Sequence, residues 1–203
     1  GFRIVGSAQA DDITGGSGND TVVGYTTGDL LDGAGGNDTL ELKASLVVSD
    51  NDALQNLETI SAATFFTKGG VGLTIDVGGQ LEGFEIIGSN YADTITGGAG
   101  ADDIDAGLGD DIIAGFVGAD EVDGGGGTDT LTLLATSADL NGAANAALVN
   151  VERVSAASAV AGVVIDLGLQ SDGFEITGSG QGDTITGSTG ADVIKAGGGD
   201  DTI

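Results

Sequence analysis

The amino-acid sequence predicts an all-β parallel solenoid, a chain wound into short strands that are joined by tight turns. Two observations carry this prediction. The chain has 40 glycines in 203 residues and no proline, cysteine, methionine, tryptophan or histidine, which fits neither an ordinary enzyme domain nor collagen. The glycines also recur in a nine-residue pattern, and similarity at a fixed period is the sequence signature of a repeat architecture.

Residues 15–23 show the repeating unit, which reads GGxGxDxUx with a large aliphatic residue at U. Glycines adopt backbone conformations that are closed to other residues, and they allow several carbonyl oxygens to face one point. The aspartate adds a charged oxygen of the kind that calcium prefers. The aliphatic residue lies two places later, on a short strand, and is expected to face the core. One unit therefore combines one candidate calcium ligand with one core position.

Twelve such units form three uninterrupted blocks, residues 6–41, 88–132 and 178–203. The sixth position of every unit is aspartate, and the eighth is always isoleucine, valine or leucine. The candidate metal ligands are Asp11, Asp20, Asp29, Asp38, Asp93, Asp102, Asp111, Asp120, Asp129, Asp183, Asp192 and Asp201. A solvated acidic surface would not need this constant register, so the pattern favours metal-lined turns on a parallel coil.

The two segments between the blocks, residues 42–87 and 133–177, are similar to each other. Residues 54–62 align with residues 148–156, and both segments alternate apolar and polar residues, the period of half-buried strands. We therefore expect them to continue the coil without metal, so that residues 1–203 form one continuous solenoid. Residues 49–56 and 137–148 contain the most helix-compatible sequence and are expected to form a helical turn or two.

The charge of the chain restricts its partners. Its 32 acidic and 5 basic residues give a net charge of −27, which argues against binding to nucleic acid or to anionic membranes, because both need lysine and arginine. No apolar run approaches the roughly 18 residues of a transmembrane helix, so membrane insertion is not expected. The predicted partners are cations.

The nonapeptide blocks resemble the repeats-in-toxin (RTX) family, whose glycine- and aspartate-rich repeats form a parallel β-roll. The resemblance implies a right-handed parallel β-solenoid in which two nonapeptides make one turn, and in which RTX β-roll blocks alternate with longer metal-free β-helix coils. It also implies Ca²⁺ between turns, held by aspartates two units apart and by backbone carbonyls. The six implied pairs are Asp11 with Asp29, Asp20 with Asp38, Asp93 with Asp111, Asp102 with Asp120, Asp111 with Asp129, and Asp183 with Asp201.

Some units depart from the family pattern. The unit at residues 24–32 has Tyr25 and Thr27 in place of glycines, and the first units of the blocks carry Gln9, Tyr91 and Gln181 at the fourth position. First units lack a preceding nonapeptide, so we expect them to cap the roll and to bind calcium weakly or not at all. The firmer candidate ligands are Asp20, Asp38, Asp102, Asp111, Asp120 and Asp129.

The resemblance implies a calcium-binding structural segment of a secreted bacterial protein at the cell surface, of the surface-layer (S-layer) or adhesin type, exported by type I secretion. Further copies of the protein or cell-surface polysaccharide are the expected partners besides calcium. The alternative is the secretion and folding module of an exported enzyme such as a protease, lipase or epimerase. Candidate exposed contacts are Tyr25, Phe65, Phe66, Tyr91 and Phe116.

The sequence does not predict catalysis by this chain. Histidine and cysteine are absent, and they are the residues most used for acid-base, nucleophilic and zinc chemistry. Four acidic residues outside the nonapeptides recur in both long repeats: Asp76, Asp166, Glu58 and Glu152. Their recurrence suits outward positions on strands better than a single active site. We therefore predict no enzymatic activity.

Overall fold

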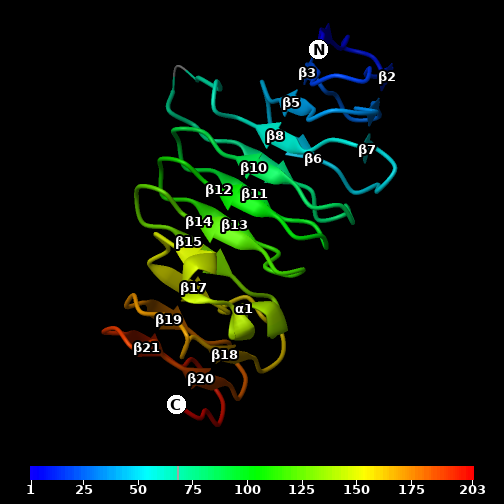
Figure 1. Ribbon diagram of the computed structural model, residues 1–203. Helices are drawn as coiled ribbons and strands as arrows, with labels where there is room; N and C mark the ends of the chain where they lie inside the picture. Colours follow the sequence, from blue (N-terminus) through cyan, green and yellow to red (C-terminus); the bar gives the residue numbers. More distant parts are fainter. Residues whose placement is uncertain (68) are drawn as a thin grey trace.

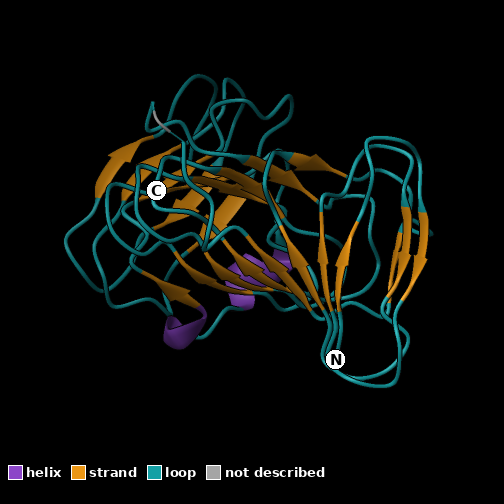
Figure 2. Ribbon diagram, turned by 90° about the horizontal axis from the view of Figure 1, so that it is seen from above, coloured by secondary structure: helices purple, strands orange, loops and turns teal. Residues whose placement is uncertain are grey.

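The computed structural model describes residues 1–67 and 69–203 and shows an all-β parallel solenoid of about 10 turns (Figure 1). Every pairing between its strands is parallel and keeps the aliphatic positions of neighbouring coils in register, as in Ile4 with Val22 and Ile95 with Ile113. The predicted fold class is therefore confirmed. Figure 2 shows the strands of successive coils lying over one another in layers, with loops at the corners of the coil.

Two eight-stranded sheets run through most of the chain. The first sheet contains β1 (Arg3–Val5), β3 (Thr21–Val23), β5 (Thr39–Glu41), β8 (Thr59–Ser61), β10 (Glu85–Ile87), β12 (Asp103–Asp105), β14 (Glu121–Asp123) and β16 (Leu148–Val149). The second sheet contains β6 (Leu46–Val47), β9 (Thr74–Asp76), β11 (Thr94–Thr96), β13 (Ile112–Ala114), β15 (Thr130–Thr132), β17 (Arg153–Ser155), β19 (Glu175–Thr177) and β21 (Val193–Lys195).

Two smaller sheets complete the coil at its ends. The third sheet contains β2 (Asp12–Thr14), β4 (Leu30–Asp32) and β7 (Leu54–Gln55), and the fourth contains β18 (Val164–Asp166) and β20 (Thr184–Thr186). The helical elements are α1 (Ala138–Gly142) and the 3₁₀ turn η1 (Asn145–Ala147).

At each spacer, the chain switches to a different pair of sheets. From β1 to β5 the chain alternates between the first and third sheets, whereas from β8 to β16 it alternates between the first and second. From β17 to β21 it alternates between the second and fourth sheets. A nonapeptide supplies one turn and one strand, so two nonapeptides make a two-sided coil. The longer spacers reach a third side, and each block therefore uses a different pair of faces.

The core is a stack of aliphatic side chains from the middle of the short strands. At the eighth position of the nonapeptides, nine of the twelve side chains are buried, with exposures of 0 to 3%. Ile13 and Ile194, near the two ends, are partly buried, and the terminal Ile203 is 73% exposed. Full burial of such a side chain stabilises the fold by about 1.5–3 kcal/mol, so stacking of coils supplies most of the stability that short strands lack alone.

The two helical predictions had different outcomes. The prediction for residues 137–148 is confirmed by α1 and η1, and the Ser137 hydroxyl oxygen caps α1 by accepting the Leu140 N–H at 3.0 Å. The prediction for residues 49–56 is wrong, because this segment ends in β7. Leu54 is completely buried and pairs with Leu31 of the coil below, so stacking overrides the local preference.

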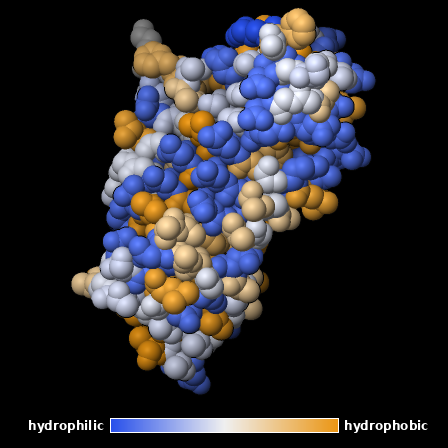
Figure 3. Space-filling model, viewed as in Figure 1, coloured by the Kyte–Doolittle hydropathy of each residue, from blue (hydrophilic) through white to orange (hydrophobic). Residues whose placement is uncertain are grey.

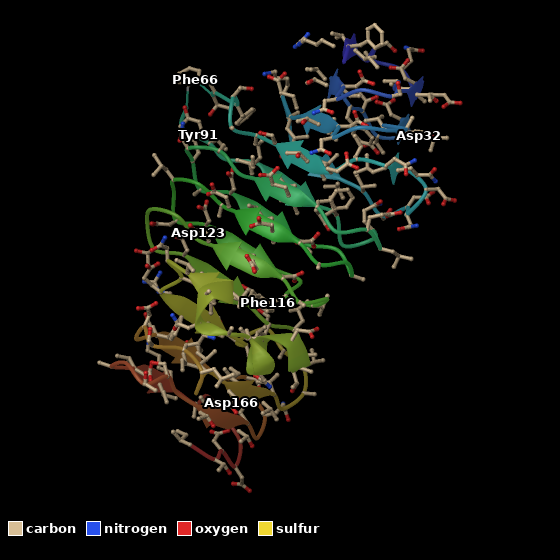
Figure 4. All side chains as sticks on the ribbon, viewed as in Figure 1. Asp32, Phe66, Tyr91, Phe116, Asp123 and Asp166 are labelled. Atoms are coloured by element: carbon tan, nitrogen blue, oxygen red, sulfur yellow. The ribbon has the colours of Figure 1, made fainter. Side chains whose placement is uncertain are left out.

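Of the aromatic residues expected at the surface, some are buried in the structure and others are exposed. Phe116 is only 3% exposed and belongs to the core, which corrects the expectation that it is a surface contact. Tyr25 and Phe65 are partly buried against the core. Phe66 is 79% exposed and lies over Tyr91, with ring centroids 6.4 Å apart (Figure 4).

The face seen in Figure 3 is largely hydrophilic, with hydrophobic residues scattered among polar ones. Within the described part of the chain, no helix is long and apolar enough to cross a membrane.

Candidate metal sites

A ladder of hydrogen bonds joins the aspartates of stacked turns. The backbone N–H of one aspartate donates to Oδ1 of the aspartate 18 residues later, and this bond occurs in all six pairs that the family resemblance implies. The N···O distances are 2.8 Å for Asp11 and Asp29, 2.7 Å for Asp20 and Asp38, 2.6 Å for Asp93 and Asp111, 2.9 Å for Asp102 and Asp120, 2.7 Å for Asp111 and Asp129, and 2.9 Å for Asp183 and Asp201. Stacking thus brings each expected pair together.

In most turns the second carboxylate oxygen is also satisfied by the protein. Oδ2 of Asp20 accepts the Gly16 N–H at 2.6 Å, and Oδ2 of Asp102 accepts the Gly98 N–H at 2.8 Å. The first unit of each block adds a serine hydroxyl, which donates to Oδ1 of its aspartate: Ser7 to Asp11 at 3.0 Å, Ser89 to Asp93 at 3.0 Å and Ser179 to Asp183 at 2.8 Å. Protein donors therefore surround the aspartates of the first units, and Ser188 donates to Oδ1 of Asp192 in the same way at 2.9 Å in a second unit.

Among the residues that the structure describes, three aspartates have a buried oxygen without a hydrogen-bond partner: Oδ2 of Asp38, Asp111 and Asp129. Their turns share a left-handed second residue, Ala34, Gly107 and Gly125, with φ of 71°, 96° and 81°. This conformation directs the N–H groups of Ala34 and Gly125 to Asp32 and Asp123, both at 2.9 Å. A buried carboxylate oxygen without a donor is costly, and a cation can satisfy it.

Two of these turns also bring a backbone oxygen of the next coil close to the orphaned carboxylate. A methyl group built on Gly33 would clash with Oδ2 of Asp38 at 2.5 Å and with the backbone oxygen of Asn56 at 2.1 Å. On Gly124 it would clash with Oδ2 of Asp129 at 2.9 Å and with the backbone oxygen of Asn150 at 2.1 Å. Glycine therefore lets both oxygens pack against the start of the turn, whereas the unit of Asp111 starts with Ala106.

These oxygens fit Ca²⁺, which takes about six to eight oxygen ligands from carboxylates and carbonyls. Among the described residues, no three side chains of histidine, cysteine or acidic type gather into a metal cluster. Backbone carbonyls would therefore supply much of each coordination shell. A bound ion would neutralise the stacked carboxylates and hold neighbouring coils together.

The electrostatics of the ladder favour a cation. Nine of the twelve aspartates are buried, with exposures of 0 to 3%, and the salt bridges of the described residues involve only Glu41 and Glu175 as acids. Burial raises the pKa of Asp111 and of Asp120 to about 6. Burial also raises the pKa of Asp129, and the negative charge of Glu152 adds to that effect. Asp20 differs, because the Gly16 and Phe2 N–H groups lower its pKa.

The raised pKa values make metal-free stability depend on pH. Between about pH 4 and pH 6 the folded chain binds more protons than the unfolded chain at Asp111 and Asp120, so the free energy of unfolding falls as the pH rises through this range. Above pH 6 both carboxylates are charged and buried. Calcium would then replace the protons as the neutralising species.

The acidic residues of the spacers fall into two groups. Asp76 and Asp166 end β9 and β18 with incompletely buried side chains, as expected, and their Oδ1 atoms accept the N–H groups of Gly78 and Gly168 at 3.0 Å each. Glu58 and Glu152 do not lie on strands, which corrects the prediction. They precede β8 and β17 and accept hydrogen bonds from the aspartate ladder.

The fold and the ladder define a metal-binding parallel β-solenoid. The chain matches the family model of the RTX calcium-binding nonapeptide repeat in four copies, at residues 5–40, 85–113, 104–131 and 177–203. These matches cover more than half of the chain, and the chain belongs to the RTX family. No curated protein sequence matches it. The repeats indicate a calcium-binding structural segment of an RTX protein, and such repeats are typical of secreted proteins.

Proposed function

We propose that this chain is a calcium-dependent structural segment of a secreted bacterial protein that acts at the cell surface, as part of a surface layer or an adhesin. The observation that carries the proposal is the buried aspartate ladder, which lies in the turns that precede strands of all four sheets. The two eight-stranded sheets overlap from β6 to β16, which supports one continuous solenoid over residues 1–203. A solenoid of this kind depends on stacking between neighbouring coils, and calcium acts at those contacts.

Calcium and folding are coupled in this proposal. All twelve nonapeptide aspartates are proposed ligands, and Asp38 and Asp129 have the strongest support because each has an orphaned carboxylate oxygen that packs, with a backbone carbonyl of the next coil, against the same glycine. Without metal, the buried carboxylates repel one another and the glycines favour the unfolded chain. Binding energy of the ordered site then becomes folding energy. Extracellular calcium modules work at about 10⁻⁴–10⁻³ M, so the segment folds after export.

The segment is proposed to be structural rather than catalytic. The sequence has no histidine, and the serines of the first units donate to metal-site aspartates instead of to a catalytic base. Exposed apolar residues such as Phe66 and Val160, at 79% and 91%, offer contacts for a further copy or for surface polysaccharide. The alternative is the terminal roll of an exported enzyme. The long repeat, in which each block uses a different pair of sheets, favours a rod instead.

A calcium titration tests the proposal. The chelator-treated chain is titrated with calcium while circular dichroism and light scattering are followed on the same samples. We expect a cooperative gain of β signal at about millimolar calcium, with magnesium unable to replace it. Growth of large particles at the same step supports a surface lattice, and a folded monomer supports an adhesin rod. A chain that is fully folded in chelator and unchanged by calcium would refute the proposed coupling.

A further inference from the structure

A short turn closes the aspartate ladder at the end of each of the first two blocks. The turns lie between β7 and β8 and between β16 and β17, and they read Asn56-Leu57-Glu58 and Asn150-Val151-Glu152. The backbone N–H of Asp38 donates to Oε2 of Glu58 at 2.7 Å, and the N–H of Asp129 donates to Oε2 of Glu152 at 2.8 Å. Each glutamate thus accepts the hydrogen bond that, elsewhere in the ladder, the aspartate of the next coil accepts. Glu58 and Glu152 follow their donors by 20 and 23 residues, whereas a ladder aspartate follows its donor by 18.

The asparagine of each turn takes the place of the first glycine of a nonapeptide, which is missing from the coil after the block. Within the first block, a methyl group on Gly15 would lie 2.4 Å from the backbone oxygen of Gly33. One coil later, a methyl group on Gly33 would lie 2.1 Å from the backbone oxygen of Asn56. The asparagine carbonyl therefore occupies the place of the first glycine carbonyl of a nonapeptide, and the carbonyl of Asn150 does the same above Gly124.

The two asparagines are held in this orientation by the same contacts. Asn56 and Asn150 adopt left-handed conformations, with φ of 49° and 51°. Their side-chain amides donate to Oδ1 of Asp32 at 2.7 Å and of Asp123 at 2.8 Å; these two aspartates end β4 and β14 and are labelled in Figure 4. The buried side chains of Leu57 and Val151 fix the middle of each turn.

We propose that each Asn-x-Glu turn completes a terminal calcium site, formed by Asp38, Glu58 and the Asn56 carbonyl in one place and by Asp129, Glu152 and the Asn150 carbonyl in the other. The independent observation is that Oδ2 of Asp38 and of Asp129 is buried without a partner, and this oxygen and the asparagine carbonyl pack against the same glycine, Gly33 or Gly124. The spacers then contribute ligands of their own. This inference rests on the calcium binding proposed above.

The test replaces each glutamate with glutamine, as Glu58→Gln, Glu152→Gln and the double variant. Glutamine keeps an oxygen that can accept the aspartate N–H, but it removes the charge that a calcium site needs. Glu82→Gln is the matched control, because Glu82 is an exposed acid of the first spacer outside these turns. Equilibrium dialysis counts the bound calcium ions, isothermal titration gives their affinities, and urea unfolding is followed with and without chelator.

We expect each single variant to lose one bound ion or to weaken one site about tenfold or more, the double variant to lose two, and the control to match the wild type. In chelator the glutamine variants should be at least as stable as the wild type, because repulsion at Asp38 or Asp129 is reduced. Unchanged ion counts and affinities in both variants, with a wild type that binds calcium, would overturn this inference alone. A wild type that binds no calcium would overturn the proposed function as well.

A second substitution covers the case in which a glutamine variant fails to fold. Glu152→Asp keeps the charge but shortens the side chain by one methylene group, so the carboxylate is drawn away from the Asp129 N–H. We expect this variant to fold in excess calcium with one weakened site. A wild-type ion count and affinity in this variant would overturn the terminal site at Glu152.

Discussion

Replacement of Gly33 with alanine tests most directly whether the close approach of two oxygens to this glycine serves a calcium site. The new methyl group would lie 2.1 Å from the backbone oxygen of Asn56 and 2.5 Å from Oδ2 of Asp38, so the backbone of one coil must move. Overpacking of this kind costs about 1–3 kcal/mol. Gly35, two residues away, is the matched control, because its methyl group would meet only the Cα of Ser17 at 3.9 Å.

The two substitutions should affect the free energy of unfolding differently. The φ of Gly35 is outside the left-handed region, so Gly35→Ala should be neutral or should stabilise by about 0.4–1 kcal/mol through the lower entropy of the unfolded chain. The two variants should then differ by about 1–4 kcal/mol in the free energy of unfolding. Urea unfolding in saturating calcium, followed by circular dichroism, measures this difference. Calcium counting should also show one ion lost in Gly33→Ala and none lost in Gly35→Ala.

The reasoning is refuted if the two variants unfold within about 0.5 kcal/mol of each other, the usual range for neutral surface changes. It is also refuted if Gly33→Ala is destabilised but still binds as many calcium ions as the wild type. In that case the close approach of the two oxygens would be a packing feature and would not belong to a metal site.

Three further predictions follow from the burial and charge of the ladder. Asp120→Asn should show more β signal than the wild type in chelator at pH 7.5, because the buried carboxylate has a pKa raised to about 6, and should unfold at a lower urea concentration than the wild type in calcium; circular dichroism under the two conditions reveals whether the sign reverses. The metal-free chain should show more β signal at pH 5 than at pH 7.5, and an equal signal at both would contradict the raised pKa values of Asp111 and Asp120. Phe116→Ala should cost about 3–5 kcal/mol, whereas Phe66→Ala, at a side chain that is 79% exposed, should stay within about 0.5 kcal/mol, as thermal melts of both variants can show.

Much of the fold was predictable because the nonapeptide is a local pattern. Its turn and its strand lie within nine residues, and the aliphatic position two residues after the aspartate faces the core because side chains alternate along a strand. The resemblance to the RTX family, in which two nonapeptides make one turn, predicted which aspartates meet, such as Asp20 and Asp38. The helix at residues 138–142 was also predictable, since Ser137 is a local cap.

The errors arose where long-range packing decided the outcome. Phe116 is buried because the second spacer passes over it, and the Ser137 hydroxyl donates to its backbone oxygen at 2.6 Å. Residues 49–56 do not form a helix because Leu54 pairs with Leu31 of the previous coil. Neither contact can be read from the neighbouring sequence.

The sequence by itself determined the repeating unit, the parallel coil and the twelve aspartates that line its turns. Only the tertiary structure decided which faces each block uses and how each of the first two blocks ends. Glu58 and Glu152 lie 20 and 23 residues after the aspartates that they contact, outside the nonapeptide period. The physical reason is that a spacer of variable length changes the number of residues between two stacked turns. The backbone hydrogen bonds between coils nevertheless keep the two turns at a constant distance in space.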